Sequence, residues 1–172
     1  MTFPQADVRV SRESWLRQPA WVCVLVLLCF PTHGHAEGED DVPESPRDAK
    51  WIQGIVDDYR AKLGISQRVD VEIVPQNALL TSVKPVDDDA STFALLIEES
   101  FLGGLTADDV RGVVAHELGH VWIFTHHPYL QTESLANQIA RRIVARDHLV
   151  HVYEKLWQRQ GTTGDLERLV GD

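Results

Sequence analysis

The sequence predicts an α+β domain, and three observations lead to this prediction. Apolar residues recur at helical spacing over residues 49–63, and a glycine follows them. Apolar and acidic residues then alternate over residues 69–74, as in a half-buried strand. A long helical pattern begins after Thr106, and another begins near Thr132. The expected order is an N-terminal helix, a small twisted β-sheet, a long helix and a following helix.

Residues 1–36 have the layout of a secretory signal. Three arginines precede an uncharged apolar run at residues 20–30, and Gly34 and Ala36 supply small residues where an exporting peptidase requires them. The alternative is a membrane anchor, but a spanning helix needs about 20 apolar residues, more than this run provides. We therefore expect cleavage after Ala36, export to the periplasm or the medium, and no stable membrane insertion afterwards.

Residues 37–48 are acidic and contain two prolines, which is typical of a flexible leader, so the domain is expected at residues 49–172. Cys23 and Cys29 both lie in the predicted signal, and a metal ion in the domain would need His, Glu or Asp ligands. The formal net charge of −10 makes nucleic acid and anionic membrane surfaces poor partners. The oligomeric state stays open.

Two further strands are expected after residues 69–74. One is a short segment near residues 79–83, and the other is the apolar run at residues 93–97. The aspartates at residues 87–89 are expected in a turn between them. The long helix then begins with Thr106 as its N-cap.

Small residues form one strip of this long helix: Gly112, Ala115 and Gly119. Because glycine costs helix stability, such a strip predicts that another element packs very closely against it. The next helix is expected at residues 132–148, where Ala136 shares a face with Glu133. We expect this face to meet the glycine strip and to bring Glu133 toward the long helix.

The motif that carries chemistry is the HELGH sequence of residues 116–120. On a helix, His116 and His120 lie one turn apart and present two imidazoles to the same point. Glu117 lies beside them, within reach of a water molecule on a metal ion that they hold. The alternative is a pair of structural histidines, which the otherwise uncharged flanks at residues 113–122 disfavour. The motif predicts two zinc ligands and a general base.

A catalytic zinc ion keeps three protein ligands and one open position, and two residues compete for the third place. His126 follows His120 by six residues, which is the spacing of HExxHxxGxxH enzymes. That pattern requires a glycine where this chain has Ile123, and a methionine turn, whereas the only methionine is Met1. Both differences count against His126.

Glu133 is the preferred third ligand. Asn137 lies one turn after Glu133 on the same helix face, where it can hydrogen-bond a ligand imidazole and fix its orientation. The expected site is one zinc ion per chain, held by His116, His120 and Glu133. A His/His/Glu ligand set favours zinc over other divalent metals.

This combination resembles a known group of enzymes. HELGH followed after a short gap by the ExxAN sequence of residues 133–137 is similar to the compact gluzincin-type zinc metallopeptidases, and the ImmA/IrrE-like peptidases have the nearest pattern. The segment at residues 77–79 is similar to the Asn-Ala segment of M48-type and minigluzincin enzymes. The resemblance covers about residues 51–150 and implies a zincin-like metallopeptidase domain. It assigns the zinc ligands to His116, His120 and Glu133, the catalytic base to Glu117, and the orientation of a ligand to Asn137.

The expected function is that of a zinc-dependent metalloendopeptidase that hydrolyses protein or peptide substrates. We expect an extended substrate to pair with the edge of the sheet near Thr92–Glu98. The donor that stabilises the oxyanion stays open among five side chains: Tyr129, His127, His148, His151 and Tyr153.

Two other interpretations compete with the peptidase. One is a non-catalytic, zinc-stabilised protein-binding module in the periplasm, which the retained Glu117 disfavours because a glutamate there is not needed as a ligand. The other is a latent enzyme that acts on a single partner protein. A basic group at residues 141–146 is interpreted as a solvated face.

Overall fold

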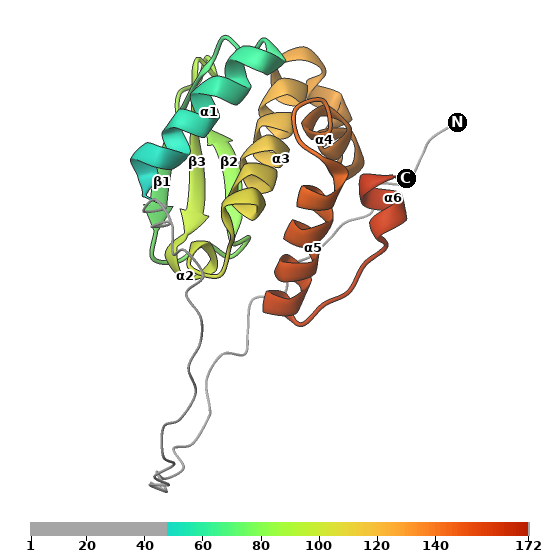
Figure 1. Ribbon diagram of the computed structural model, residues 1–172. Helices are drawn as coiled ribbons and strands as arrows, with labels where there is room; N and C mark the ends of the chain where they lie inside the picture. The colour runs from blue at the N-terminus through green and yellow to red at the C-terminus, as the bar shows by residue number, and fades with distance from the viewer. Residues whose placement is uncertain (1–47, 172) are drawn as a thin grey trace, which may run out of the picture. The chain divides into compact units, whose positions relative to one another are not determined.

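Residues 48–171 are described by the computed structural model of the chain (Figure 1). The predicted signal at residues 1–36 and the leader up to residue 47 lie outside the described residues, and so do both cysteines. Within residues 48–171, no helix is both long enough and apolar enough to cross a membrane. The predicted α+β class and the predicted order of helices and strands are confirmed.

The sheet consists of β1 (Arg68–Val74), β2 (Thr81–Pro85) and β3 (Thr92–Glu98) in the order β1-β3-β2. β3 pairs with β1 in parallel and with β2 in antiparallel orientation, so it is the central strand. The prediction that Thr92–Glu98 offers an edge to a substrate is therefore wrong. The open edge beside the long helix belongs to β2.

The hydrogen-bond register shows which groups of β2 face outward. Val86 N–H donates to the Thr92 carbonyl (2.9 Å), and the Leu80 carbonyl accepts from Glu98 N–H, so the even-numbered residues of β2 pair with β3. Because pairing alternates along an antiparallel strand, Thr81, Val83 and Pro85 direct their backbone groups away from β3. Proline has no N–H group, so this edge offers two donors and three carbonyl acceptors.

Two helices pack against each other and cover the sheet (Figure 1). α1 (Ala49–Leu63) begins at Asp48, whose side chain accepts from Trp51 N–H, and ends at Gly64, whose φ of 68° lies in the left-handed region. α1 packs on β1, whereas the long helix α3 (Ala107–His126) packs on β2. The short helix α2 (Glu99–Leu102) connects β3 to α3.

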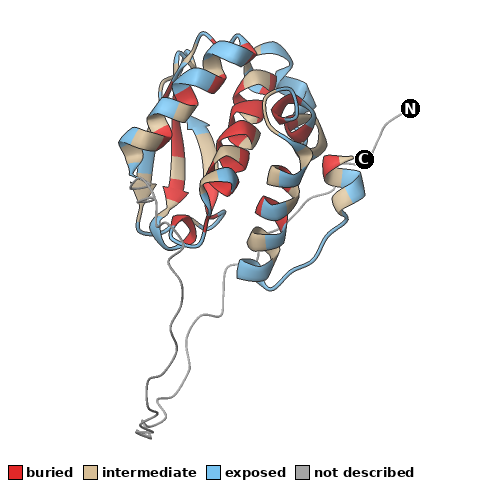
Figure 2. Ribbon diagram, in the orientation of Figure 1, coloured by how far each residue is buried: buried red, intermediate tan, exposed pale blue. Residues whose placement is uncertain are grey.

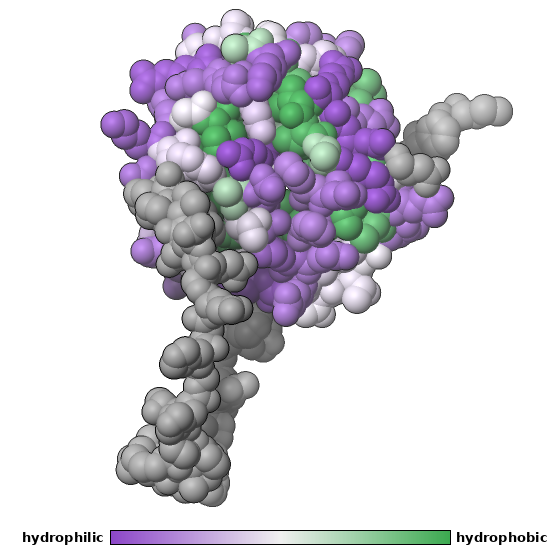
Figure 3. Space-filling view, viewed as in Figure 1, coloured by the Kyte–Doolittle hydropathy of each residue, from purple (hydrophilic) through white to green (hydrophobic). Residues whose placement is uncertain are grey.

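α3 forms the centre of the core. Its N-cap is Thr106, as predicted, and a capping box with Asp109 satisfies the first backbone N–H groups. Most residues of α3 between Asp109 and Ile123 are buried, which Figure 2 shows as an almost continuous buried stretch. The face of the domain seen in Figure 3 is mostly hydrophilic, with scattered apolar patches. The core consists of buried apolar side chains from the helices and the sheet.

The segment after α3 differs from its prediction. A single helix is expected at residues 132–148, but the structure has a 3₁₀ turn, η1 (Pro128–Leu130), then α4 (Glu133–Ala140) and, after a turn, α5 (Arg146–Gln160). The chain turns before α5 because Ala145, the N-cap of α5, is extended (φ −68°, ψ 150°), and α5 then packs on α3. A last short helix, α6 (Leu166–Val170), contacts α4 and α5.

Candidate metal centre and cleft

Three side chains from two helices converge at the predicted site. His116 and His120 project from one face of α3, and their Nε2 atoms are 3.2 Å apart. Glu133, the first residue of α4, places Oε2 3.2 Å from His116 Nε2 and Oε1 3.5 Å from His120 Nε2. The structure thus brings Glu133 to the two histidines and forms a group of donor atoms that could hold a metal ion.

The donor separations fit a tetrahedral ion. Ligand atoms bonded to zinc at about 2.0–2.1 Å lie about 3.3 Å from one another in tetrahedral geometry. The separations among His116, His120 and Glu133 are 3.2 to 3.5 Å. A cation between these three donors would therefore need little rearrangement of their side chains.

Hydrogen bonds on the far side of each imidazole leave the Nε2 atoms free for a cation. His116 Nδ1 lies 2.8 Å from Asn137 Oδ1, and His120 Nδ1 lies 3.1 Å from Gln131 Oε1. Amide oxygens only accept, so in the neutral imidazoles each Nδ1 carries the proton and each Nε2 keeps its lone pair. Two lone pairs and a carboxylate at this distance repel one another unless a cation lies between them. The donor set therefore fits a divalent metal.

Gln131 is the residue of this arrangement that the sequence did not reveal. It follows η1 in a loop, eleven residues after His120, and its Nε2 also donates to the backbone carbonyl of His120 (3.2 Å). No local pattern distinguishes this glutamine from an ordinary loop residue. Asn137, by contrast, lies where the sequence predicts it, fully buried behind His116.

The pKa shifts of Glu133 and His120 show how charge is distributed in the site. When the imidazoles carry a second proton on Nε2, their hydrogen bonds to Glu133, first from His116 and then from His120, hold the pKa of Glu133 far below its ordinary value. Burial lowers the pKa of His120, but the hydrogen bonds to Glu133 and Gln131 outweigh burial and raise it. Glu133 is therefore an anion at neutral pH, and its charge favours a cation at the centre of the three donors.

Close helix packing positions Glu133 and Asn137. A Cβ built on Gly119 would overlap the carbonyl oxygen of Ala136, so α4 crosses α3 at the glycine, as the sequence predicts. Gly112 meets a different partner, because a Cβ there would lie 2.9 Å from the His148 carbonyl oxygen on α5. Two helices thus pack against the small-residue strip of α3: α4 at Gly119 and α5 at Gly112.

Glu117 is the second carboxylate of the site. Only 5% of its surface is exposed, and it lines the same cleft as the two histidines. Burial raises its pKa, while His116 and His120 act in the opposite direction. A carboxylate with a raised pKa, next to a metal site that it does not complete, is suited to accept a proton and release it again.

Tyr153 is the one member of the five oxyanion candidates that lines the cleft. Its hydroxyl donates to Glu133 Oε2 (3.2 Å) and accepts from Asn137 Nδ2 (2.9 Å). Burial raises the pKa of Tyr153, so the phenol keeps its proton. Tyr129, in contrast, is 97% exposed on η1.

His126 lies apart from the donor cluster. Its ring stacks on Trp122 with a centroid distance of 4.2 Å, and its Nδ1 lies 2.9 Å from the Trp122 backbone carbonyl. His126 is thus a residue of the end of α3, in agreement with the preference for Glu133 as the third member of the donor set.

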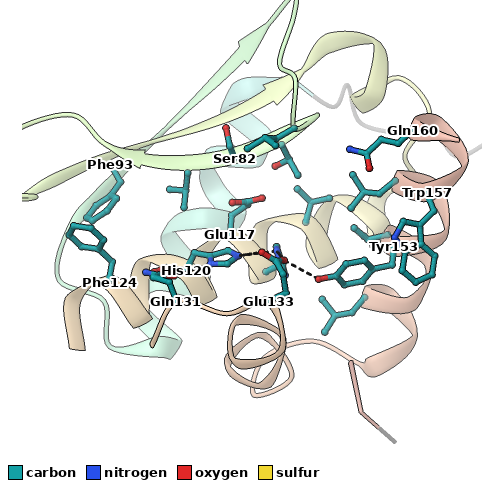
Figure 4. A pocket seen from close by; sticks show the side chains of 18 of the residues that line it. Ser82, Phe93, Glu117, His120, Phe124, Gln131, Glu133, Tyr153, Trp157 and Gln160 are labelled. Atoms are coloured by element: carbon teal, nitrogen blue, oxygen red, sulfur yellow. Dashed lines mark hydrogen bonds and ion pairs between the residues drawn. The ribbon is translucent and has the colours of Figure 1, made fainter. Parts of the chain in front are cut away.

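The site opens into a cleft of about 500 Å³ that runs along β2 (Figure 4). Phe93 and Phe124 lie at one end, with their rings edge to face and 5.5 Å apart. Trp157 and Gln160 of α5 lie at the other end, and His120 and Glu133 lie between the two ends. Further apolar walls of the cleft come from β2, α3 and α5: Val83, Val113, Leu149, Val152 and Leu156.

Comparisons with known proteins give one structural likeness. The sequence matches no model of a known protein family. It also matches no curated protein. A solved structure, the metallopeptidase zymogen abylysin of Pyrococcus abyssi, is similar over 66% of this chain and 99% of its own, with 15% identity and a TM-score of 0.46. A likeness at that TM-score does not establish a common fold.

Proposed function

We propose that this protein is a zinc-dependent metalloendopeptidase with His116, His120 and Glu133 as the zinc ligands and one zinc ion per chain. The observation that carries the proposal is the pair of carboxylates in one cleft. Glu133 completes the donor set, whereas Glu117 is buried beside that set. A purely structural zinc site has no use for the second carboxylate.

The roles of the residues follow from their surroundings. Zinc, when bound, would polarise the scissile carbonyl and lower the pKa of a bound water molecule toward about 7. Glu117 then accepts the proton of the attacking water and delivers it to the leaving amine, helped by its raised pKa. Tyr153 keeps its hydroxyl proton and can donate it as a hydrogen bond to the developing oxyanion.

The substrate we propose is an extended peptide that pairs with the open edge of β2. Thr81 and Val83 direct their backbone groups toward the cleft side of the sheet, and both residues line the cleft. A peptide strand there would gain main-chain hydrogen bonds and pass over the three donors. The open edge of β2 thus replaces Thr92–Glu98 as the proposed binding site for the substrate backbone.

The ends of the cleft favour large apolar side chains in the substrate. The rings of Phe93 and Phe124 line one end, and Leu156 and Trp157 line the other. Burial of an apolar substrate side chain between such walls contributes about 1.5–3 kcal/mol. We expect cleavage next to residues such as leucine or phenylalanine, in proteins outside the cytoplasm if the predicted signal operates.

Metal analysis with matched variants tests the zinc site. About one zinc per chain is expected in the wild type and in His126→Ala, and loss of zinc is expected in Glu133→Ala. A folded wild-type protein without affinity for zinc would contradict the proposal.

Cleavage of a peptide library separates an enzyme from a zinc-stabilised binding module. Glu117→Gln should keep zinc and lose cleavage, because an amide cannot accept the proton. If the zinc-loaded wild type cleaves no peptide and Glu117→Gln retains binding to a partner protein, the binding module is the better description.

A further inference from the structure

The last turn of α6 is joined to the metal centre through backbone carbonyls. Three consecutive carbonyls at the end of this helix each accept a hydrogen bond from a side chain of α4 or of the residues that follow it. The pairs are Leu169 with Asn137 Nδ2 (3.0 Å), Val170 with Arg141 (2.9 Å), and Gly171 with Arg146 Nε (2.6 Å). Two of the arginines interpreted as a solvated face therefore hold α6 in place.

Asn137 is the link between α6 and the metal centre. Its side chain is fully buried and makes three contacts, to His116 Nδ1, Tyr153 Oη and the Leu169 carbonyl. A carboxamide can turn by half a rotation and exchange its oxygen and nitrogen, so its neighbours decide its orientation. The Tyr153 hydroxyl accepts from Asn137 while it donates to Glu133, but a hydroxyl can rotate and donate to an amide oxygen instead, so it does not fix the orientation by itself.

The Leu169 carbonyl fixes the orientation of the Asn137 amide. A carbonyl oxygen only accepts, so the atom of Asn137 that faces Leu169 must be the amide nitrogen. The amide oxygen then faces His116 Nδ1, which must carry the proton in order to donate. His116 Nε2 consequently keeps its lone pair and faces the other two donor side chains.

We propose that α6, through the Leu169 carbonyl, fixes the orientation of Asn137 and thereby the tautomer of His116 that can bind a metal. The inference rests on the proposed metal site and adds Leu169 as a positioning residue. Without this carbonyl, Asn137 can turn its NH₂ group toward Nδ1, and the proton of His116 moves to Nε2. That tautomer points an N–H group into the donor cluster and must lose its proton before metal binds.

His120 provides an internal reference. Gln131 orients it, and the Gln131 amide is fixed by the backbone carbonyl of His120 itself. No group of α6 takes part in these two hydrogen bonds. Release of α6 should therefore change the tautomer of His116 and leave that of His120 as it is, which a general loss of structure would not do.

The test compares the wild-type chain with a chain that ends at Gly164 and with the full-length double variant Arg141→Ala/Arg146→Ala. The double variant keeps all residues of α6 and covers the case in which the shortened chain fails to fold. Arg168→Ala, an exposed arginine on α6, is the control. ¹⁵N NMR of the metal-free proteins near pH 8, above the ordinary histidine pKa of about 6.5, reports which ring nitrogen carries the proton.

We expect His116 of the wild type and of Arg168→Ala to carry its proton on Nδ1. Release of α6 should populate the Nε2–H form of His116 alone and weaken zinc binding about 10- to 100-fold. Asn137→Asp in the shortened chain should restore Nδ1–H, since a carboxylate presents an acceptor in either orientation.

A folded α6-released protein in which His116 keeps Nδ1–H and zinc affinity stays within twofold of the wild type would overturn the inference. Equal tautomer changes at His116 and His120 would also overturn it. The NMR measurement needs neither metal nor substrate, so failure of the proposed peptidase activity would leave its result unaffected.

Discussion

Gly119 of α3 lies directly against the backbone of Ala136 in α4. A Cβ built on Gly119 would be 3.0 Å from both the Cα and the carbonyl carbon of Ala136, and it would overlap the carbonyl oxygen. Backbone atoms cannot turn aside as a flexible side chain can. The distance between the two helices, and with it the position of Glu133 at the start of α4, therefore depends on the missing side chain of Gly119.

Gly119→Ala should separate α3 from α4 and damage the metal centre. Overpacking of this kind costs about 1–3 kcal/mol of stability, and displacement of Glu133 and Asn137 should weaken zinc binding at least 10-fold. Zinc titration and thermal unfolding of the variant measure the two effects.

The control for this variant is Gly54→Ala, because nothing lies within 4 Å of a Cβ built on Gly54 in α1. That substitution should stabilise the protein by about 0.5–1 kcal/mol, since glycine is unfavourable inside a helix. Unchanged zinc affinity in Gly119→Ala would show that α4 does not depend on this close contact.

Tyr153→Phe should reduce kcat while zinc stays bound. The hydroxyl is the one oxyanion candidate in the cleft, and loss of such a donor typically lowers kcat about 10²- to 10³-fold. KM should change little, because the ring and its packing remain. Steady-state kinetics on a cleaved peptide provide the measurement, with Tyr129→Phe as the matched control on the exposed η1 turn. A kcat like that of the wild type would assign the oxyanion donor elsewhere.

Proline substitutions on β2 should reveal which backbone groups bind the substrate. Val83→Pro removes an N–H that points away from β3, so the sheet should persist while kcat/KM falls about 10-fold through one lost hydrogen bond. Lys84→Pro removes an N–H that pairs with β3 and should instead lower the melting temperature. An equal effect of the two variants on stability would contradict the assignment of the Val83 N–H to the open edge and of the Lys84 N–H to the pairing with β3.

The ionised carboxylate of Asp109 should increase the free energy of unfolding, and this contribution should be lost in acid. The residue is 2% exposed and accepts from Thr106 N–H (2.8 Å) and Lys155 Nζ (2.8 Å). Burial raises the pKa of Asp109, but the hydrogen bonds from Lys155 and Thr106 outweigh burial and lower it. The pKa is thus lower in the folded than in the unfolded chain. The stabilisation is present above the unfolded pKa of about 4 and is lost as pH falls through the folded pKa.

Asp109→Asn should therefore cost about 2–4 kcal/mol at pH 7 and reduce the loss of stability on acidification. Urea unfolding at a series of pH values measures both effects. Asp108→Asn is the control, because Asp108 is 63% exposed and its ion pair with Arg111 lies on the surface. That variant should change the free energy of unfolding by no more than about 1 kcal/mol. Equal effects of the two substitutions on the free energy of unfolding would contradict the stabilising role of the buried Asp109 carboxylate.

Features with local causes could be predicted from the sequence. The bounds of α1 follow from apolar spacing and the glycine after it, and the start of α3 follows from its N-cap. The convergence of His116, His120 and Glu133 could also be predicted, because helical spacing fixes two of these residues and the small-residue strip predicts the packing of the third.

Features with distant causes could not be predicted. The central position of β3 depends on parallel pairing with β1 across the sheet, and the turn after Ala140 has no proline or glycine to mark it. Gln131, in a loop, contacts His120, and the backbone carbonyl of Leu169 contacts Asn137. Neither the type of side chain nor the spacing in the sequence identifies these two residues. Both make contacts that only the folded chain creates.

The open edge of β2 also bears on the behaviour of the protein at high concentration. An unpaired strand that can receive a peptide can equally receive the same strand of another molecule and begin aggregation. Pro85 removes one donor from this edge, Lys84 places an exposed cation on the strand, and the strand is only five residues long. These features limit growth of a sheet from molecule to molecule, while Thr81 and Val83 keep enough donors for one short segment of chain.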